Sequence, residues 1–317
     1  MDRIDTELNE SHCKYVSSRG LMKSCDIYPP NPVSSTRSCY DYAWETLKPG
    51  AIVYIISSAI PHFRMAGLPR IKVPFVLVSG DCDETIPYDI FRSPEDTLSF
   101  VEDERIVAWF CQNSTLRHPK VHPLPIGLDY HTLSVNTRHS WGPKQTPEQQ
   151  ERILTLLAKR AEGKGRKFLA YSNFHFSMNT RLAGDRHKAI AEVPNDLVFY
   201  EPTACSRFDS WLHQIDYLFV LSPHGGGLDC HRTWEALALG CYPIVRTSPI
   251  DALFEGLPIL IVKEWSDVTP GRLAEFSAEQ ERKRIGGTLH LEKLSLAYWT
   301  NRVREVATAV AAGGTAN

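Results

Sequence analysis

The sequence predicts an α/β protein whose strands form parallel sheets. Two observations support this class. Short, continuously apolar segments recur along the 317-residue chain, and helical patterns lie between several of them. Continuous apolar runs are typical of strands buried on both faces, and helices that alternate with such strands cover those faces. The length suffices for one large domain or for two domains of ordinary size, each with its own core.

Each strand is predicted from a short run rich in aliphatic and aromatic residues. These runs are 51–57, 74–80, 105–112, 167–172, 197–201, 216–222, 241–245 and 257–262. Helical periodicity predicts helices over 147–163, 206–215 and 291–310, the last amphipathic through Leu291, Leu294, Tyr298 and Val306. The polar stretch 136–150 is the expected linker between two halves, and we expect the final segment, 311–317, to be disordered.

Composition places the chain among ordinary globular proteins, with 43% hydrophobic and 23% charged residues. A formal net charge of −2 gives no sign of a nucleic-acid binder. The eight cysteines are scattered without a C-x-x-C pair, the first residues are too polar for a signal peptide, and no apolar run could span a bilayer. We therefore expect reduced cysteines and a cytoplasmic protein without a transmembrane segment.

The most informative segment is "SPHGGGLDCHRTWEALALGCYPIV", residues 222–245. Proline and three successive glycines end the preceding strand, a helical pattern starts at Leu228, and Gly240 supplies a C-terminal stop before the next strand. Glycines let a ligand approach the main chain, and a helix N-terminus offers unpaired N–H groups and a partial positive charge. The segment therefore predicts an anion site, and phosphate is the anion that such sites most often bind.

Side chains behind the glycines extend this prediction. His231 and Glu235 are four residues apart on one helix face, with Arg232 beside them. Arg232 can complement a phosphate, and Glu235 can accept hydrogen bonds from ribose hydroxyls. An ordinary strand–turn–helix connection, with Asp229 as a cap and Arg232 and Glu235 paired in solvent, stays open. The predicted donor-binding residues here are Ser222, His224, Gly225, Gly226, Gly227, Asp229, His231, Arg232 and Glu235.

The segment resembles the donor-binding region of exostosin-like glycosyltransferases of the GT-B class. The matching positions are Ser222, Pro223, Gly225, Gly227, Arg232, Glu235, Gly240, Cys241 and Pro243, followed by "SPIDALFEGLPILIV". The resemblance implies a nucleotide-sugar donor, an inverting reaction, and two Rossmann-like domains that face each other across a cleft. On this basis we expect an acceptor-binding domain over 1–145, a donor-binding domain over 146–290, and a C-terminal helix in 291–317 that crosses back to the first domain.

A second donor contact is expected after the strand at 167–172, because ligands of open α/β sheets lie beyond the carboxyl ends of the strands. Asn173, Arg181 and Arg186 follow this strand. Arg181 is nearer to the strand end, so it is the favoured phosphate ligand, and Arg186 is the reserve. Both could equally be ordinary surface arginines.

The first half should supply the acceptor site and a general base. Asp81, Asp83 and Glu84 follow a buried strand, and one of them, with Asp81 favoured, is expected to take the proton of the acceptor hydroxyl. The alternative is a capped turn. His62 follows another strand and is a weaker candidate for the same role. The predicted acceptor-binding residues are Gln112 and Asn113.

These expectations describe a metal-independent hexosyl- or pentosyltransferase that moves a sugar from a UDP- or GDP-linked donor to a hydroxyl of a glycan or another acceptor. No further cofactor is expected. "DCD" (81–83) also matches a metal-binding D-x-D pair, so a metal-dependent transferase that uses Asp81 and Asp83 is one alternative. A protein that binds a nucleotide-sugar without catalysis is another. Pro119 and Pro123 argue against a helical zinc site at His118 and His122.

Overall fold

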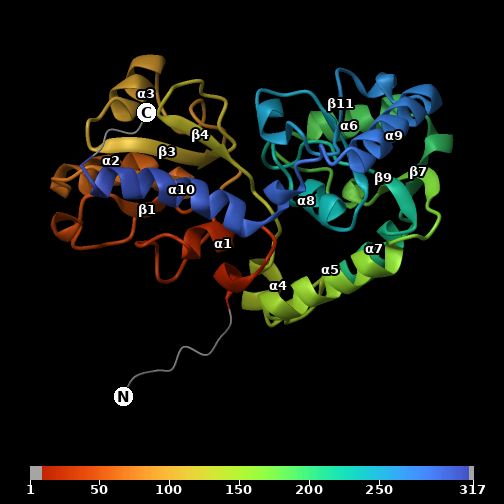
Figure 1. The fold of residues 1–317 in the computed structure, drawn as a ribbon, viewed down its shortest axis with the longest axis horizontal. Coiled ribbons are helices and arrows are strands. Elements are labelled where there is room, and N and C mark those ends of the chain that lie inside the picture. The colour runs from red at the N-terminus through yellow and green to blue at the C-terminus, as the bar shows by residue number, and fades with distance from the viewer. Residues whose placement is uncertain (1–8, 314–317) are drawn as a thin grey trace.

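The computed structural model describes residues 9–313 and divides them between two parallel sheets, each with helices around it (Figure 1). The predicted α/β class with parallel strands is therefore confirmed. Both sheets are built from the apolar runs of the sequence, and their central strands are buried. No helix among residues 9–313 is long and apolar enough to cross a membrane.

The first sheet has the strand order β1-β2-β3-β4, which is also the order along the chain. Its strands are β1 (Ala51–Ile56), β2 (Phe75–Gly80), β3 (Ile106–Gln112) and β4 (Val121–Leu124). Strand β4 was not expected, because it contains Pro123 and lies close to Pro119. Proline is tolerated here because β4 is an edge strand and pairs only with β3.

The second sheet has the order β11-β10-β9-β7-β8. Its strands are β7 (Lys167–Ser172), β8 (Val198–Tyr200), β9 (Tyr217–Leu221), β10 (Tyr242–Arg246) and β11 (Leu260–Val262). The chain places β8 on one side of β7 and β9 on the other, so the direction of strand addition reverses between β7 and β9. Such a reversal opens a crevice at the carboxyl ends of the two strands, where open α/β sheets bind ligands.

Helices and short turns connect these strands. The helices outside the C-terminal region are α1 (Ser18–Lys23), α2 (Ile60–Ala66), α3 (Pro94–Val101), α4 (His131–Val135), α5 (Pro147–Ala161), α6 (Ala183–Glu192), α7 (Arg207–Gln214), α8 (His231–Ala238) and α9 (Pro270–Ile285). Short 3-10 helices lie at Glu10–His12, Trp44–Thr46, Ser57–Ala59, Leu68–Arg70, Phe174–Phe176, Asn195–Leu197, Asp251–Phe254, Trp265–Asp267 and Leu291–Leu294. All eight cysteines are free thiols.

The expected linker at 136–150 is partly ordered as secondary structure. It contains a small antiparallel pair, β5 (Arg138–His139) and β6 (Gly142–Pro143), followed by the start of α5. Thr146 caps α5 by accepting a hydrogen bond from the main-chain N–H of Gln149, whose side chain accepts one from Thr146 N in return. This capping box explains why the polar stretch ends where the helix begins.

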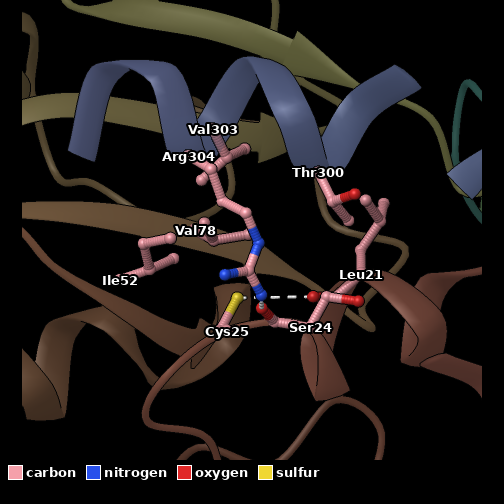
Figure 2. A pocket seen from close by; sticks show the side chains of 8 residues that line it. All are labelled: Leu21, Ser24, Cys25, Ile52, Val78, Thr300, Val303 and Arg304. Atoms are coloured by element: carbon pink, nitrogen blue, oxygen red, sulfur yellow. Dashed lines mark hydrogen bonds between the residues drawn. The ribbon is translucent and has the colours of Figure 1, made fainter. Parts of the chain in front are cut away.

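The C-terminal helix α10 (Leu296–Ala311) lies against the first sheet, far from the half that precedes it in sequence (Figure 1). The helical pattern at 291–310 is interrupted at Ser295, whose side chain caps α10 by accepting from Tyr298 N. Figure 2 shows Arg304 reaching from α10 toward α1, where its guanidinium donates to Ser24 O at 3.0 Å. The expected disorder at 311–317 falls largely on residues 314–317, which lie outside the described residues.

Candidate functional site

The crevice between β7 and β9 is bordered by two arginines, Arg186 and Arg232. Arg186 lies in the first turn of α6 and is 6% exposed, and its Nε donates to His224 O at 3.2 Å. Arg232 lies in the first turn of α8, over the ring of Phe174, and its Nη1 is 3.3 Å from Pro223 O and 3.4 Å from Ser222 Oγ. The two guanidinium groups therefore converge on the loop that leaves β9.

These two arginines have positive charge without a carboxylate in ion-pair contact. Within residues 9–313, the hydrogen-bond partners of both guanidinium groups are main-chain carbonyls and the Ser222 hydroxyl. Burial and the nearby charge of Arg232 lower the pKa of Arg186 to about 10. Two cations held together at the switch point of a parallel sheet attract an anion, because an anion would neutralise their mutual repulsion.

His224 adds a third polar group to this crevice. It lies three residues beyond the end of β9 and is 5% exposed. Its Nδ1 donates to Leu228 O at 2.8 Å, whereas its Nε2 is buried without a hydrogen-bond partner in the described part of the chain. A buried ring nitrogen without a partner costs free energy, so a ligand that bonds to it would stabilise the site.

The glycine turn (223–227) has a different role from the one predicted. None of its glycines has a left-handed φ. A Cβ at Gly225 would lie 2.5 Å from Arg186 Nη2, one at Gly226 would collide with the Asp83 carboxylate, and one at Gly227 would lie 2.6 Å from Asn113 Nδ2. The glycines therefore make room for side chains of the protein itself, two of them from the first half.

Asp229 does not serve as a donor ligand in this arrangement, because its carboxylate is used by the fold. It is 2% exposed and accepts hydrogen bonds from Ile126 N at 2.8 Å, Cys230 N at 2.9 Å and the indole of Trp234 at 2.9 Å. Burial raises its pKa to about 6, although these hydrogen bonds oppose the shift. The expected helix start at Leu228 is also displaced, since α8 begins at His231.

Glu235 is also occupied, so its predicted contact with ribose hydroxyls has no support in the structure. One of its carboxylate oxygens pairs with Arg207 Nη2, and the other accepts from the indole of Trp211 at 3.1 Å. Both partners lie on α7, so Glu235 joins α8 to α7. The sequence reasoning did not anticipate Arg207, a buried cation more than twenty residues away in the chain.

Arg181, the favoured phosphate ligand, instead joins the two halves. Its guanidinium donates to Gly226 O at 2.8 Å and, in the first half, to Asp83 O at 2.8 Å and Thr85 Oγ1 at 2.9 Å. It also pairs with Asp89 at 2.5 Å. The order of preference between the two arginines is therefore reversed, because Arg186 has no such carboxylate partner in the described part of the chain.

The remaining predicted donor residues lie at the switch point or at its border. Asn173 follows β7, and its Nδ2 donates to Ser210 Oγ at 2.8 Å. Ser222 follows β9, and its hydroxyl is 2.8 Å from that of Thr233. His231 turns toward the first half, where its Nδ1 donates to Gly127 O at 2.7 Å. Ser222 thus contacts Arg232, Asn173 is bonded to α7, and His231 lies at the junction of the halves.

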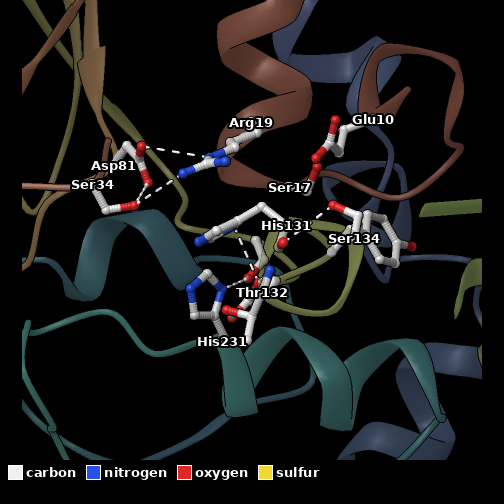
Figure 3. A network of polar contacts seen from close by, with 12 residues as sticks. Glu10, Ser17, Arg19, Ser34, Asp81, His131, Thr132, Ser134 and His231 are labelled. Atoms are coloured by element: carbon white, nitrogen blue, oxygen red, sulfur yellow. Dashed lines mark hydrogen bonds and ion pairs between the residues drawn. The ribbon is translucent and has the colours of Figure 1, made fainter. Parts of the chain in front are cut away.

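A polar network lies at the carboxyl edge of the first sheet (Figure 3). Asp81 follows β2 with a left-handed φ of 52° and is 5% exposed. Its carboxylate accepts from Ser34 Oγ at 2.7 Å and lies 3.6 Å from the Nε of Arg19, a buried residue of α1. Arg19 Nη2 is in turn 3.3 Å from Ser34 Oγ. Asp81 is thus held in a buried ion pair that its neighbours in sequence do not reveal.

His131, the first residue of α4, connects this network to the second half. Its Nδ1 lies 3.1 Å from Asp129 Oδ1, and its ring centroid is 6.3 Å from that of His231 (Figure 3). Burial lowers the pKa of His131. Arg19 and His231 lower this pKa further, whereas the negative charges of Asp129 and Asp81 oppose the shift. The surroundings therefore favour the neutral imidazole, which is the form that accepts a proton.

Asp129 stays ionised beside that imidazole. Burial by itself would raise the pKa of Asp129, but the positive charge of the buried Arg207 and a hydrogen bond from Thr132 N help to hold it well below its ordinary value. The carboxylate also accepts from the hydroxyl of Thr132 at 2.7 Å. The carboxylate lies within ion-pair distance of His131 Nδ1, although Nδ1 makes no hydrogen bond within residues 9–313, so Asp129 acts on the imidazole through its charge.

The other catalytic candidates predicted in the first half, Glu84, His62 and Asp83, lie outside this network. Glu84 pairs with the surface residue Arg37, and the exposed His62 accepts from Cys39 N at 3.1 Å. Asp83 is exposed and lies against Gly226. These three residues therefore border the junction or the surface rather than the buried network.

Gln112 and Asn113 are buried and already used, so their predicted acceptor contacts are not supported. Gln112 accepts from Asp81 N at 3.2 Å and donates to Cys82 O at 3.3 Å. Asn113 accepts from Asp229 N at 3.0 Å and donates to Cys82 O at 3.3 Å. Together they hold the turn after β2 and attach it to the second half.

Arg19 and His131 are the functional candidates that sequence reasoning missed. "LDYH" (128–131), with an aspartate two residues before a histidine, was a usable signal for His131, whereas "SSRG" (17–20) contains none for Arg19. No protein-family model matches the chain, and a search of curated proteins finds no match. The contacts therefore define the chemistry of the site: a cationic crevice on the second sheet and a His–Asp pair with a buried Arg–Asp pair on the first.

Proposed function

We propose that this protein is an inverting, metal-independent glycosyltransferase of GT-B architecture that transfers a sugar from a nucleotide-sugar to a hydroxyl group. The observation that carries this proposal is the Arg186–Arg232 pair at the β7/β9 switch point, which has no carboxylate in ion-pair contact within residues 9–313. A diphosphate brings two or more negative charges to one place, which matches two adjacent guanidinium groups. The exostosin-like pattern at 222–245 supports the same donor class.

The reaction assigned to these groups is a single displacement. The acceptor hydroxyl oxygen forms a bond to the anomeric carbon and gives its proton to Nε2 of His131. The bond from that carbon to the diphosphate oxygen breaks, and its electron pair leaves with the nucleoside diphosphate. Arg186 and Arg232 stabilise the negative charge that develops on this leaving group, which is the role of preorganised cations in such transfers.

His131 is a better proton acceptor than Asp81, which the sequence favoured. Asp81 faces the guanidinium of Arg19 at 3.6 Å, and protonation of its carboxylate would leave that buried cation without its counter-charge. Burial lowers the pKa of His131, which favours its neutral form, and the Asp129 carboxylate lies 3.1 Å from its Nδ1. We assign Asp81 and Arg19 to positioning, and His131 to proton transfer.

The metal-dependent alternative requires Asp81 and Asp83 to share a cation. A cation at Asp81 would have to displace Arg19, whose positive charge already occupies that position. Asp83 lies against Gly226 on the other side of the junction. The arginine pair can neutralise a diphosphate without a metal, so we favour the metal-independent reaction.

The direct test is a thermal-shift screen with UDP, GDP, CMP and their sugars, with and without EDTA. One nucleotide series should raise the midpoint of unfolding, because a ligand that binds only the folded state stabilises it by mass action. EDTA should leave the shift unchanged. Arg186→Ala and Arg232→Ala should each lower the affinity about tenfold or more, since each removes a charge-assisted contact.

Arg272→Ala is the matched control, because Arg272 is an exposed arginine of α9 that pairs with Glu275. It should leave the shift intact. The proposal fails if no nucleotide stabilises the protein, or if stabilisation survives in the Arg186→Ala/Arg232→Ala double variant. A shift that EDTA abolishes would return the choice to the metal-dependent reaction.

A further inference from the structure

Three metal-ligating side chains meet at the carboxyl edge of β8, beside the crevice described above. They are Glu201, which follows β8, Cys205 in the next loop, and His213 on α7. The carboxylate oxygen, the thiol sulfur and the imidazole nitrogen all lie within 4.8 Å of one another. The proposed glycosyl transfer uses none of these three residues, so their convergence needs a separate explanation.

The contacts of Glu201 hold its carboxylate toward the other two groups. Glu201 is 5% exposed, and its Oε2 lies 3.0 Å from His213 Nδ1. The same oxygen accepts from the hydroxyl of Tyr171 at 2.8 Å, and that hydroxyl is 3.2 Å from Ser210 Oγ. Hydrogen bonds of this kind orient the ligands of metal sites from outside the coordination sphere.

The surroundings favour a cation. Within residues 9–313, the charged partner of Glu201 is His213, whose own charge depends on protonation. A divalent cation would supply the positive charge that this buried carboxylate lacks, and it would replace the thiol proton.

We propose that Glu201, Cys205 and His213 bind a zinc ion. Zinc is the divalent metal that takes thiolate, imidazole and carboxylate ligands together, whereas magnesium and calcium prefer oxygen ligands. Tetrahedral zinc places its ligand atoms about 3.5 Å apart. Zinc entry would therefore open the Glu201–His213 contact slightly and draw Cys205 inward. A water molecule completes the fourth position, and the thiol proton passes to solvent.

Bound zinc would connect β8, its following loop and α7. Helix α7 contributes Arg207 and Trp211, which hold Glu235, and Ser210, which accepts from Asn173. The site would thus stabilise one wall of the crevice. The zinc proposal stands on the three ligands alone and does not depend on glycosyl transfer, since zinc binding can be measured without any nucleotide.

The test is a zinc titration of the tag-free, chelator-treated full chain by calorimetry, repeated with cobalt by absorption spectroscopy. We expect one metal ion per chain and a thiolate-to-cobalt charge-transfer band. Cys205→Ser should remove the band, and Cys205→Ser and His213→Ala should each weaken zinc binding at least about tenfold. Cys39→Ser and His187→Ala are matched controls, a half-buried cysteine of the first half and an exposed histidine of α6, and neither should change binding.

A measurement on the unaltered protein guards against variants that fail to fold. Zinc should slow the alkylation of Cys205, followed by mass spectrometry of the peptide that contains it, and should leave the alkylation of Cys39 unchanged. The zinc site is refuted if the chain binds no stoichiometric zinc, if the cobalt complex has no thiolate band, or if zinc leaves the alkylation of Cys205 unchanged.

Discussion

The two sheets end in carboxyl edges of opposite character. At the first edge, strand order follows chain order, and the buried charges compensate one another: Asp81 pairs with Arg19 at 3.6 Å, and Gln112 and Asn113 donate to Cys82 O in the turn after β2. At the second edge, the strand order reverses between β7 and β9, and Arg186 and Arg232 converge without a carboxylate in ion-pair contact within residues 9–313. The second edge therefore needs charge from a ligand, whereas the first edge does not.

The junction between the halves explains why so many polar residues gather near the glycine turn. The Asp229 carboxylate accepts a hydrogen bond from Ile126 N of the first half, and the Arg181 guanidinium donates to Asp83 O and Thr85 Oγ1. Polar residues can therefore cluster near the glycine turn for two reasons: to bind a ligand, or to attach one half of the protein to the other. Only the partners of each side chain distinguish the two.

Replacing His131 should have the largest effect and tests the assignment at the first edge. His131→Gln should lower the rate of sugar transfer or donor hydrolysis about a hundredfold or more, because it removes the proton acceptor. Asp81→Asn should lower the rate less, through the misplacement of Arg19. Both rates are measured with the donor that the thermal-shift screen identifies. The opposite order of effects would restore Asp81 as the base.

Asp229→Asn tests whether the junction is structural. The amide can no longer accept from Ile126 N, Cys230 N and Trp234 together, so the free energy of unfolding should fall by about 1–3 kcal/mol. Urea unfolding measures this loss. Nucleotide affinity of the folded variant should be unchanged. A stable variant with weak nucleotide binding would show instead that Asp229 contacts the donor.

The pH dependence of stability gives a second view of Asp229. Its pKa is raised from 3.8 to about 6 in the folded protein, so the folded state holds this proton more tightly than the unfolded chain. The resulting stabilisation is fully present below pH 3.8 and is lost as the pH rises through about 6. The unfolding free energies of the native protein and Asp229→Asn should therefore converge as the pH rises through this window, because the native protein loses stability relative to the variant.

A comparison of two glycines separates a rigid contact from a flexible one. Gly227→Ala should cost about 1–3 kcal/mol, because the buried Asn113 is held by Asp229 N and Cys82 O and cannot move aside. Gly226→Ala should cost less, because the exposed Asp83 carboxylate can turn toward solvent. Chemical unfolding of both variants decides this. Equal losses would mean that the turn itself, rather than Asn113, sets the cost.

The smallest effect is expected on the far side of the first sheet. Arg304→Ala removes one exposed hydrogen bond, to Ser24 O, and should lower the free energy of unfolding by about 0.5–1 kcal/mol. Neither nucleotide affinity nor turnover should change, since the residues that line the pocket in Figure 2 include none of those assigned to the proposed reaction. A loss of turnover in this variant would indicate that α10 couples to the site.

The sequence alone located the strands that are continuously apolar, because a strand buried on both faces must be apolar throughout and that requirement is local; it did not locate β4, β5 and β6. It also identified the loop after β9 as a place where other groups approach the main chain closely. Only the tertiary structure decided the strand order, the acceptance of Pro123 in an edge strand, and the use of each charged side chain. Asp229, Glu235 and Arg181 are bound by partners far away in the chain, whereas Arg186 and Arg232 have no such carboxylate in the described residues. A charged side chain is available to a ligand only when no other residue compensates its charge. The compensating residue is often far away in the sequence, so the sequence pattern around the charged residue does not reveal it.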